Sequence, residues 1–434
     1  MIMVMDRAPN NRALSQELLR GRTRGPHATR GGMGWSAVKM KALRYHGKNN
    51  VAVDDVPEPA ILTPHDAILR VTSTAICGSD LHMVAGFVPT VEKGDVFGHE
   101  FMGEVVEVGS GVTKVKRGDR VLVPFTISCG ACMHCRAGMT SLCDNTNPNA
   151  WMGDILLGYT CSGLYGYTHA FGGYPGGQAE YVRVAFADAN CFAVPDELSD
   201  EQVLFLTDVF PTGYQAAEQA EISPGDVVAI WGCGPVGWFT IQSAFMLGAS
   251  RVIAIDRISY RLERARALGA DTIDFTEQDV VETLKVETAG RGPDRAIDCV
   301  GMEAHSFAPD ALLDRAKQVV RLTFDRAHVI RQAIYAVGKG GVVSVPGVYA
   351  GFIDKFPMGV VVNKALKIVS GQTHVHKYVP LLLDKVRSGQ IDPSNVISHV
   401  LPLDEAPRGY EMLINKIDNC EKVVLKPGWS ATAA

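Results

Sequence analysis

Four cysteines lie close together, at a spacing that suits a metal ion. Thiolates this near to one another, on a loop relaxed by Gly130 and Gly138, can close a tetrahedral site with no open position, as structural zinc requires. An iron–sulfur cluster is the alternative, because thiolates also hold those. Unligated, reduced thiols are the third possibility. The first expectation is a structural zinc held by Cys129, Cys132, Cys135 and Cys143.

A second group of possible ligands is spread over two short stretches. The first carries Cys77, Ser79 and His82, and the second carries His99 and Glu100. Taken singly, each is compatible with an ordinary buried role. Together they supply a thiolate, an imidazole and an adjacent carboxylate. A catalytic zinc needs three protein ligands and an open fourth position, so one ligand must come from elsewhere in the chain.

A glycine-rich turn spans residues 232–237, which read Gly-Cys-Gly-Pro-Val-Gly. It follows an apolar run at 227–231 and opens a helical pattern at 236–247, which is the context of a dinucleotide-binding fingerprint. The glycines permit a tight turn and close approach to a pyrophosphate at the helix N-terminus. Asp256, after the next predicted strand, would bind the adenosine ribose and favour NAD. Arg257 is a complication, because a neighbouring arginine can accommodate a 2′-phosphate. The predicted cofactor contacts are Gly232, Gly234, Pro235, Val236, Gly237, Asp256 and Arg257.

The secondary-structure elements that must position these residues show two different patterns along the chain. Residues 40–187 contain short alternating strands, for example 67–72, 101–108 and 119–123, separated by Gly, Pro and Asp turns. From about residue 207, strands at 227–231, 252–255, 295–299 and 342–345 alternate with helical patterns, which predicts a parallel sheet. Residues 302–339 show helical spacing and are predicted to be one or two inserted helices. A helix at 378–388 and strands at 396–401 and 422–425 could return to the first domain.

Composition excludes several classes of protein. The chain has 434 residues, 47% hydrophobic and 21% charged, with a net charge of −5. That balance gives no electrostatic footprint for nucleic acid, and no apolar run reaches the roughly 18 residues that cross a bilayer. Ten cysteines are too few for a disulfide scaffold in a chain of this length. We therefore expect a cytoplasmic protein. Residues 1–39 are expected to be a flexible tail, with an arginine-rich transit peptide as the alternative.

The stretch Gly98-His99-Glu100-x2-Gly103-x5-Gly109-x2-Val112 resembles the signature of the zinc-containing medium-chain alcohol dehydrogenases. The other motifs occur in that family's order, and the resemblance covers about residues 40–427. It implies an α/β protein with a β-rich GroES-like catalytic domain and a Rossmann coenzyme domain with a doubly wound parallel sheet. The expected boundaries are 40–208 and 373–427 for the catalytic domain, and 209–372 for the NAD-binding domain with its insertion.

The resemblance also implies residue roles. The segment 205–214 would deliver the third catalytic zinc ligand, which is Asp208 here, as in glutathione-independent formaldehyde dehydrogenases, where many members have Cys. The catalytic metal ligands would be Cys77, His99 and Asp208, with Glu100 as the alternative to Asp208. Ser79 would bond the substrate oxygen and start a proton relay to His82. Arg261 would lie near the adenosine ribose and Lys422 near the pyrophosphate.

The sequence thus predicts an oxidoreductase that transfers hydride between an alcohol, or a hydrated aldehyde, and NAD, with one catalytic and one structural zinc per chain. A formaldehyde dehydrogenase or dismutase that retains its NAD is the alternative within the enzymes. A catalytically silent zinc- and nucleotide-binding protein is the alternative of another class. The expected partners are a small alcohol or aldehyde and, by resemblance, further copies in a homodimer or homotetramer. Side chains that could shape the substrate pocket are Phe125, Trp151 and Phe171.

Overall fold

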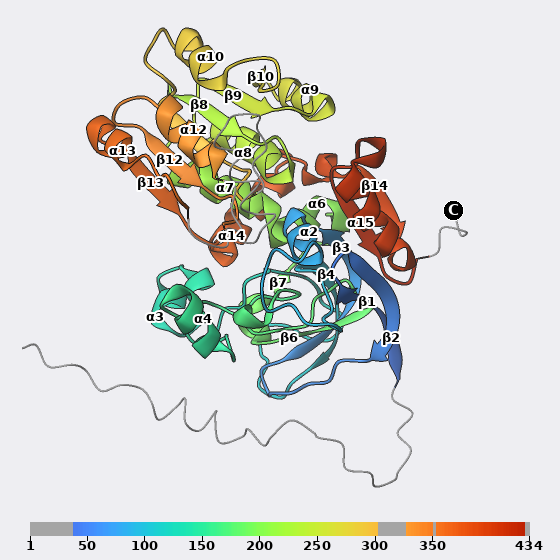
Figure 1. Ribbon diagram of the computed structural model, residues 1–434. Coiled ribbons are helices and arrows are strands. Elements are labelled where there is room, and N and C mark those ends of the chain that lie inside the picture. Colours follow the sequence, from blue (N-terminus) through green and yellow to red (C-terminus); the bar gives the residue numbers. More distant parts are fainter. Residues whose placement is uncertain (1–37, 303–326, 350–352, 430–434) are drawn as a thin grey trace, which may run out of the picture. The chain divides into compact units, whose positions relative to one another are not determined.

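The computed structural model describes residues 38–302, 327–349 and 353–429 (Figure 1). The predicted tail, apart from its last two residues, lies outside the described residues. So does most of the predicted insertion at 302–339. The described remainder of that insertion includes the helix α12, His328–Ala336.

The predicted parallel sheet is present and has six strands. Its order is β10-β9-β8-β11-β12-β13, and every neighbouring pair is parallel. In chain order this is 3-2-1-4-5-6, the arrangement of a doubly wound Rossmann sheet. The strands are β8 (Val227–Trp231), β9 (Arg251–Asp256), β10 (Asp271–Asp274), β11 (Arg295–Asp298), β12 (Val342–Val345) and β13 (Lys367–Ser370).

Helices cover both faces of this sheet, which explains the continuous apolar run of β8. Ala229 and Trp231 pack with α10 (Val280–Glu287), α12 and α13 (Met358–Lys364) on one face. Their neighbours Val228 and Ile230 pack with α7 (Val209–Gln219), α8 (Pro235–Met246) and α9 (Ser259–Ala267) on the other face. Alternate residues of one strand therefore belong to two separate cores.

The β-rich part forms a second sheet, in the order β14-β15-β3-β4-β5-β7, with β6 paired to β3. The C-terminal strand β15 pairs antiparallel with β3, so the chain returns to this sheet after the parallel one. A hairpin of β1 and β2 lies beside it (Figure 1). The strands are β1 (Lys39–Gly47), β2 (Asn50–Pro57), β3 (Ala67–Ile76), β4 (Glu100–Val108), β5 (Arg120–Val123), β6 (Tyr181–Val184), β7 (Phe192–Ala193), β14 (His399–Pro402) and β15 (Val423–Lys426).

Two predicted strands differ from the structure by more than one residue: the strand expected at 67–72 continues to Ile76 as β3, and the strand at 396–401 is displaced. The strand expected at 396–401 begins only at His399, because Pro393–Val396 forms a 3-10 turn, η4. The side chain of Asp392 accepts a hydrogen bond from the Ser394 N–H and so starts that turn.

The remaining helices and 3-10 turns lie in the connections between strands. They are α2 (Gly78–Val84), α3 (Met133–Arg136), α4 (Ala150–Leu157), α5 (Ala187–Asn190), α6 (Asp200–Val203), α14 (Val375–Arg387), α15 (Ala406–Asn415), η1 (Thr140–Leu142), η2 (His169–Phe171), η3 (Leu204–Thr207), η5 (Leu403–Glu405) and η6 (Ile417–Asn419). Among the helices in the described ranges, none is long and apolar enough to cross a membrane.

Candidate active site and metal centres

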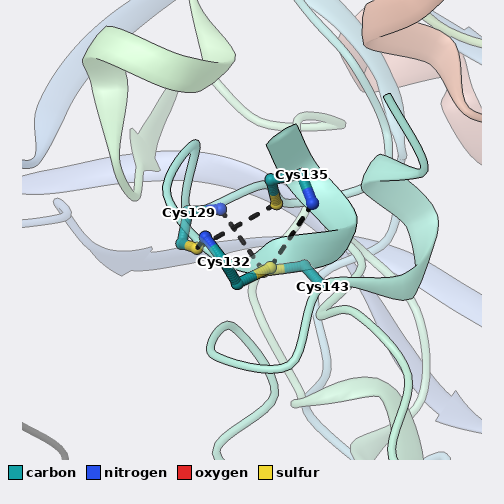
Figure 2. A group of neighbouring side chains, drawn as sticks. All are labelled: Cys129, Cys132, Cys135 and Cys143. Carbon is teal, nitrogen blue, oxygen red and sulfur yellow. Dashed lines mark hydrogen bonds between the residues drawn. The ribbon is translucent and has the colours of Figure 1, made fainter. Parts of the chain in front are cut away.

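The four clustered cysteines converge on one point (Figure 2). Their sulfurs lie within 4.8 Å of one another, and the pairs Cys129–Cys135 and Cys132–Cys143 are each 4.0 Å apart. Four thiolates at the usual zinc–sulfur distance would stand about 3.8 Å apart in a tetrahedron. The cluster therefore fits a structural zinc with only a slight contraction.

The backbone around this cluster is built to receive thiolates. The N–H groups of Ala131 and Cys132 point at the sulfur of Cys129, at 3.5 and 3.3 Å. Gly130 has a φ of +71°, a conformation that glycine adopts without strain. Hydrogen bonds from Cys135 and Cys143 lower the pKa of Cys129, and the same contacts with Cys129 raise the pKa of Cys135 and of Cys143.

The second metal group brings together Cys77, His99, Glu100 and Asp208, whose ligand atoms also lie within 4.8 Å of one another. Asp208 Oδ2 is 3.6 Å from Cys77 Sγ and 3.3 Å from His99 Nε2. A tetrahedral zinc with ordinary bond lengths would separate those atom pairs by about 3.5 and about 3.3 Å. The donor set fits a zinc ion bound by the thiolate, the imidazole and one carboxylate oxygen.

Three separate elements deliver these side chains. Cys77 is the N-cap of α2, directly after β3. His99 directly precedes β4, which pairs with β3 so that Ala75 lies opposite Glu100. Asp208 stands between η3 and α7. The antiparallel β3–β4 pair thus brings the thiolate and the imidazole together, and the start of α7 brings the Asp208 carboxylate to them.

Asp80 supports this group, a role that the sequence did not predict. Its Oδ2 accepts a hydrogen bond from the Cys77 N–H at 3.0 Å, and its Oδ1 is 3.2 Å from His99 Nδ1. A carboxylate behind a ligating histidine fixes the ring and leaves Nε2 for the metal. The spacing from Cys77 to Asp80, three residues on at the N-terminus of a helix, is the sequence signal that could have identified it.

The site is buried and rich in negative charge. Burial opposes the imidazolium, yet the charge of Asp80 and other neighbours raises the pKa of His99 well above its usual value. Burial would also raise the pKa of Asp208, but the hydrogen bond with His99 outweighs it and lowers that pKa. Burial raises the pKa of the Cys77 thiol. A buried set of acids around one imidazole is the environment that a divalent cation would neutralise.

Glu100 has a different partner from the other carboxylates. Its Oε1 is 2.5 Å from Lys422 Nζ, and both side chains are almost completely buried, at 0% and 1% exposure. The Lys422 ammonium also lies 5.7 Å from the ring centre of Phe205. Lys422 therefore stands against Glu100 beside the metal group, while it also borders the cavity described next.

A cavity of about 560 Å³ joins the metal group to the glycine turn. Ser79 and His82 line it beside Cys77 and His99. Its other lining residues include most of the predicted cofactor contacts: Gly232, Gly234, Pro235, Val236, Asp256, Arg257 and Arg261. Gly237 does not line it and acts by packing, because a Cβ there would stand 1.8 Å from the carbonyl oxygen of Gly232.

The walls of the cavity near the metal group were only partly foreseen. Phe125 lines it as expected, whereas Trp151 is 57% exposed on α4 and neither Trp151 nor Phe171 is among the lining residues. Residues that the sequence did not indicate also border it, namely Leu164, Tyr167, Thr212, Gln372 and Thr373. Thr212 lies on α7, within the segment 205–214 that carries Asp208, whereas the other four come from connections between elements and no local motif marks them.

At the dinucleotide end, Asp256 is fixed by the backbone. Its Oδ2 accepts a hydrogen bond from the Cys233 N–H at 2.8 Å, and its Oδ1 accepts one from the Arg257 N–H at 2.7 Å. Arg261 donates to Glu421 Oε2 at 2.8 Å. The Arg257 side chain is exposed beside the cavity.

Comparison with known proteins matches both halves of the chain. The model of the alcohol dehydrogenase GroES-like domain matches residues 63–196, and the zinc-binding dehydrogenase model matches residues 235–321. A zinc-type alcohol dehydrogenase-like protein of Bacillus subtilis is 43% identical, over 89% of this chain and all of that protein. The glutathione-independent formaldehyde dehydrogenase of the same organism is 35% identical, over 87% of this chain and 95% of its own length. The structure of an alcohol dehydrogenase from Thermus sp. ATN1 superposes with a TM-score of 0.75 at 38% identity, covering 89% of this chain and 100% of that one.

Proposed function

Because the chain belongs to the zinc-containing alcohol dehydrogenase family of oxidoreductases, we propose that it transfers hydride between a primary or secondary alcohol and NAD. The observation that carries the proposal is the single cavity that has the second metal group at one end and the glycine turn with Asp256 at the other. We assign residues 40–208 and 373–427 to the catalytic domain, and 209–372 to the coenzyme domain.

The metal ligands in this proposal are Cys77, His99 and Asp208, and the four-cysteine cluster holds the structural zinc. When bound, the catalytic zinc supplies a Lewis acid that favours the deprotonated substrate oxygen, and the dinucleotide supplies the hydride acceptor. Glu100 is assigned to Lys422 as its counter-ion rather than to the metal, because their ion pair is short and buried.

Ser79 and His82 transfer the proton that leaves the substrate oxygen. The Ser79 hydroxyl lies 3.2 Å from His99 Nε2, close enough to the metal group to hydrogen-bond a substrate oxygen there. His82 follows three residues later on α2 and lines the same cavity, so it can take the proton onward.

The charged residues beside the glycine turn favour NAD over its phosphorylated form. The Asp256 carboxylate would accept hydrogen bonds from the ribose and repel a 2′-phosphate. Arg261 donates a hydrogen bond to Glu421 at 2.8 Å. Because the Glu421 carboxylate partly neutralises its charge, Arg261 attracts a 2′-phosphate less strongly than an unpaired arginine would. Arg257 is the opposing feature, because its exposed guanidinium lies at the same end of the cavity.

The test combines metal analysis with turnover. Zinc content is measured for the unmodified chain and for Asp208→Asn, alongside reduction of NAD and NADP with a panel of alcohols and formaldehyde. We expect two zincs per chain to fall to one and activity to be lost. Asp196→Asn, which removes an exposed carboxylate nearby in the sequence, is the control and should retain both zincs. Two zincs and intact turnover in Asp208→Asn would exclude Asp208 and point to Glu100.

A second candidate is oxidation of hydrated formaldehyde, or its dismutation with a dinucleotide that is retained between turnovers. It is favoured by the 35% identity with a glutathione-independent formaldehyde dehydrogenase. This candidate predicts that the purified chain carries NAD through gel filtration and converts formaldehyde to formate and methanol without added cofactor. Free exchange of NADH at every turnover would exclude retention and leave the dehydrogenase.

A further inference from the structure

A short segment between β13 and α14, residues 371–374, lies beside the metal group and is held from two sides. On one side, the Gln215 side chain on α7 accepts a hydrogen bond from the His374 N–H at 2.9 Å. On the other side, the Ser141 hydroxyl lies 2.8 Å from His374 Nδ1. Ser141 belongs to residues 129–143, which carry the four clustered cysteines and are called the cysteine lobe below. Ser141 is two residues from the structural ligand Cys143, so the lobe anchors this segment.

Thr373 of this segment is connected to Asp208 through the hydroxyl group of Thr212. Its Oγ1 lies 2.9 Å from Thr212 Oγ1, and Thr373 is only 4% exposed. Thr212 Oγ1 is in turn 2.9 Å from the backbone oxygen of Asp208 and 3.1 Å from its Oδ1. Both atoms of Asp208 can only accept, and Thr212 has one hydroxyl proton. Thr212 therefore donates to Asp208, and Thr373 donates to Thr212.

The two oxygens of the Asp208 carboxylate consequently face different partners. Oδ1 lies 3.1 Å from the Thr212 hydroxyl, whose proton it shares with the backbone oxygen of Asp208, whereas Oδ2 faces Cys77 Sγ at 3.6 Å and His99 Nε2 at 3.3 Å. We propose that Thr212 and Thr373 are positioning residues that hold Asp208 as a one-oxygen ligand of the metal. This inference rests on the proposed function, in which Asp208 is that ligand.

The physical reason is the freedom of a carboxylate at this position. Aspartate can bind a metal through one oxygen or two, or rotate away from it, whereas the thiolate of Cys77 has one donor atom. A hydrogen bond to Oδ1 selects one orientation before the metal arrives, so less freedom is lost on binding. Loss of such outer partners typically weakens metal binding about 10- to 100-fold.

The experiment compares four variants. Thr212→Val and Thr373→Val remove the two hydroxyls, and Thr212→Ser restores the first. Thr240→Val is the matched control, because Thr240 is a buried helical threonine whose hydroxyl bonds the carbonyl of Val236 at 2.8 Å and no carboxylate. Zinc affinity is measured by competition with a chromophoric chelator. The visible spectrum is recorded after cobalt(II) exchange, because it reports the ligand geometry independently of turnover.

We expect Thr212→Val to weaken the binding of one of the two zinc ions by about 10-fold or more and to alter the visible absorption bands of the cobalt(II) form. Thr373→Val should shift both in the same direction, while Thr212→Ser and Thr240→Val stay within about twofold of the unmodified chain. Unchanged affinity and spectrum in Thr212→Val would overturn the inference, as would an equal loss in Thr240→Val. An unmodified chain that binds only one zinc would overturn the proposed function as well, so the two failures are distinguishable.

Discussion

The buried pair of Glu100 and Lys422 permits a quantitative test of how charge is held beside the metal group. The perturbation is Lys422→Met, which keeps most of the volume of the side chain and removes its charge. Nζ and Oε1 are 2.5 Å apart, and the two side chains are 1% and 0% exposed. Removing one partner of such a pair leaves a buried charge without compensation, which costs about 3–5 kcal/mol of stability.

The surface of the same protein offers a matched control. Lys41 and Asp404 form an ion pair of nearly the same length, 2.7 Å, but their side chains are 49% and 59% exposed. Solvent screens exposed pairs, which typically contribute about 0.2–1 kcal/mol. Lys41→Met should therefore lower the free energy of unfolding far less than Lys422→Met, although each change removes one lysine from a short contact.

The assay is urea unfolding followed by circular dichroism and by tryptophan fluorescence, at one fixed concentration of free zinc. The zinc affinity of each variant is measured in parallel, because the contribution of bound metal to stability depends on it. The double variant Glu100→Gln/Lys422→Met removes both charges and should recover a large part of the loss, because no unpaired carboxylate is left buried. Two results would refute the reasoning: a loss below about 1 kcal/mol in Lys422→Met, or a double variant no more stable than the single one.

Two further predictions concern the glycine turn and the cysteine lobe. Gly237→Ala would place a Cβ 1.8 Å from the Gly232 oxygen, so the turn must shift and NADH binding, measured by fluorescence titration, should weaken at least about 10-fold. Gly359→Ala on α13 meets nothing within 4 Å and should bind NADH normally; equal affinity in both variants would contradict the packing argument. Cys143→Ser should lose the structural zinc, leaving one zinc per chain by metal analysis, with a lower thermal midpoint. Cys161→Ser, a buried cysteine outside the cluster, should keep both zincs, and two zincs in Cys143→Ser would exclude it as a ligand.

The parts of the fold that the sequence predicted well are those with one dominant signal. The strands at 227–231 and 342–345 match β8 and β12 residue for residue. Residues 227–231 form an unbroken apolar run, as expected of a strand buried on both faces, and 342–345 is apolar except for Ser344. The strand at 396–401 was misplaced because its apolar pattern continues into η4, where the Asp392 turn decides the conformation. Local turn chemistry overrode hydrophobic periodicity there.

Three carboxylates converge on the metal group, and their different partners explain what the sequence could not resolve. Asp80 accepts from the backbone of Cys77 and from Gln178, at 3.0 and 3.2 Å, so it is committed to the helix N-terminus. Glu100 Oε1 accepts a hydrogen bond from the ammonium group of Lys422, which is 322 residues away in the chain. Asp208 Oδ2 lies 3.6 Å from Cys77 Sγ and 3.3 Å from His99 Nε2, and a carboxylate oxygen of Glu100 also lies within 4.8 Å of these atoms. Spacing alone leaves Glu100 and Asp208 as competing ligands, because the contacts of Lys422 with Glu100 and of Thr212 with Asp208 arise only in the tertiary structure. Our proposal of Asp208 as the metal ligand therefore rests on the neighbours of each carboxylate, and not on its proximity to His99 in the sequence.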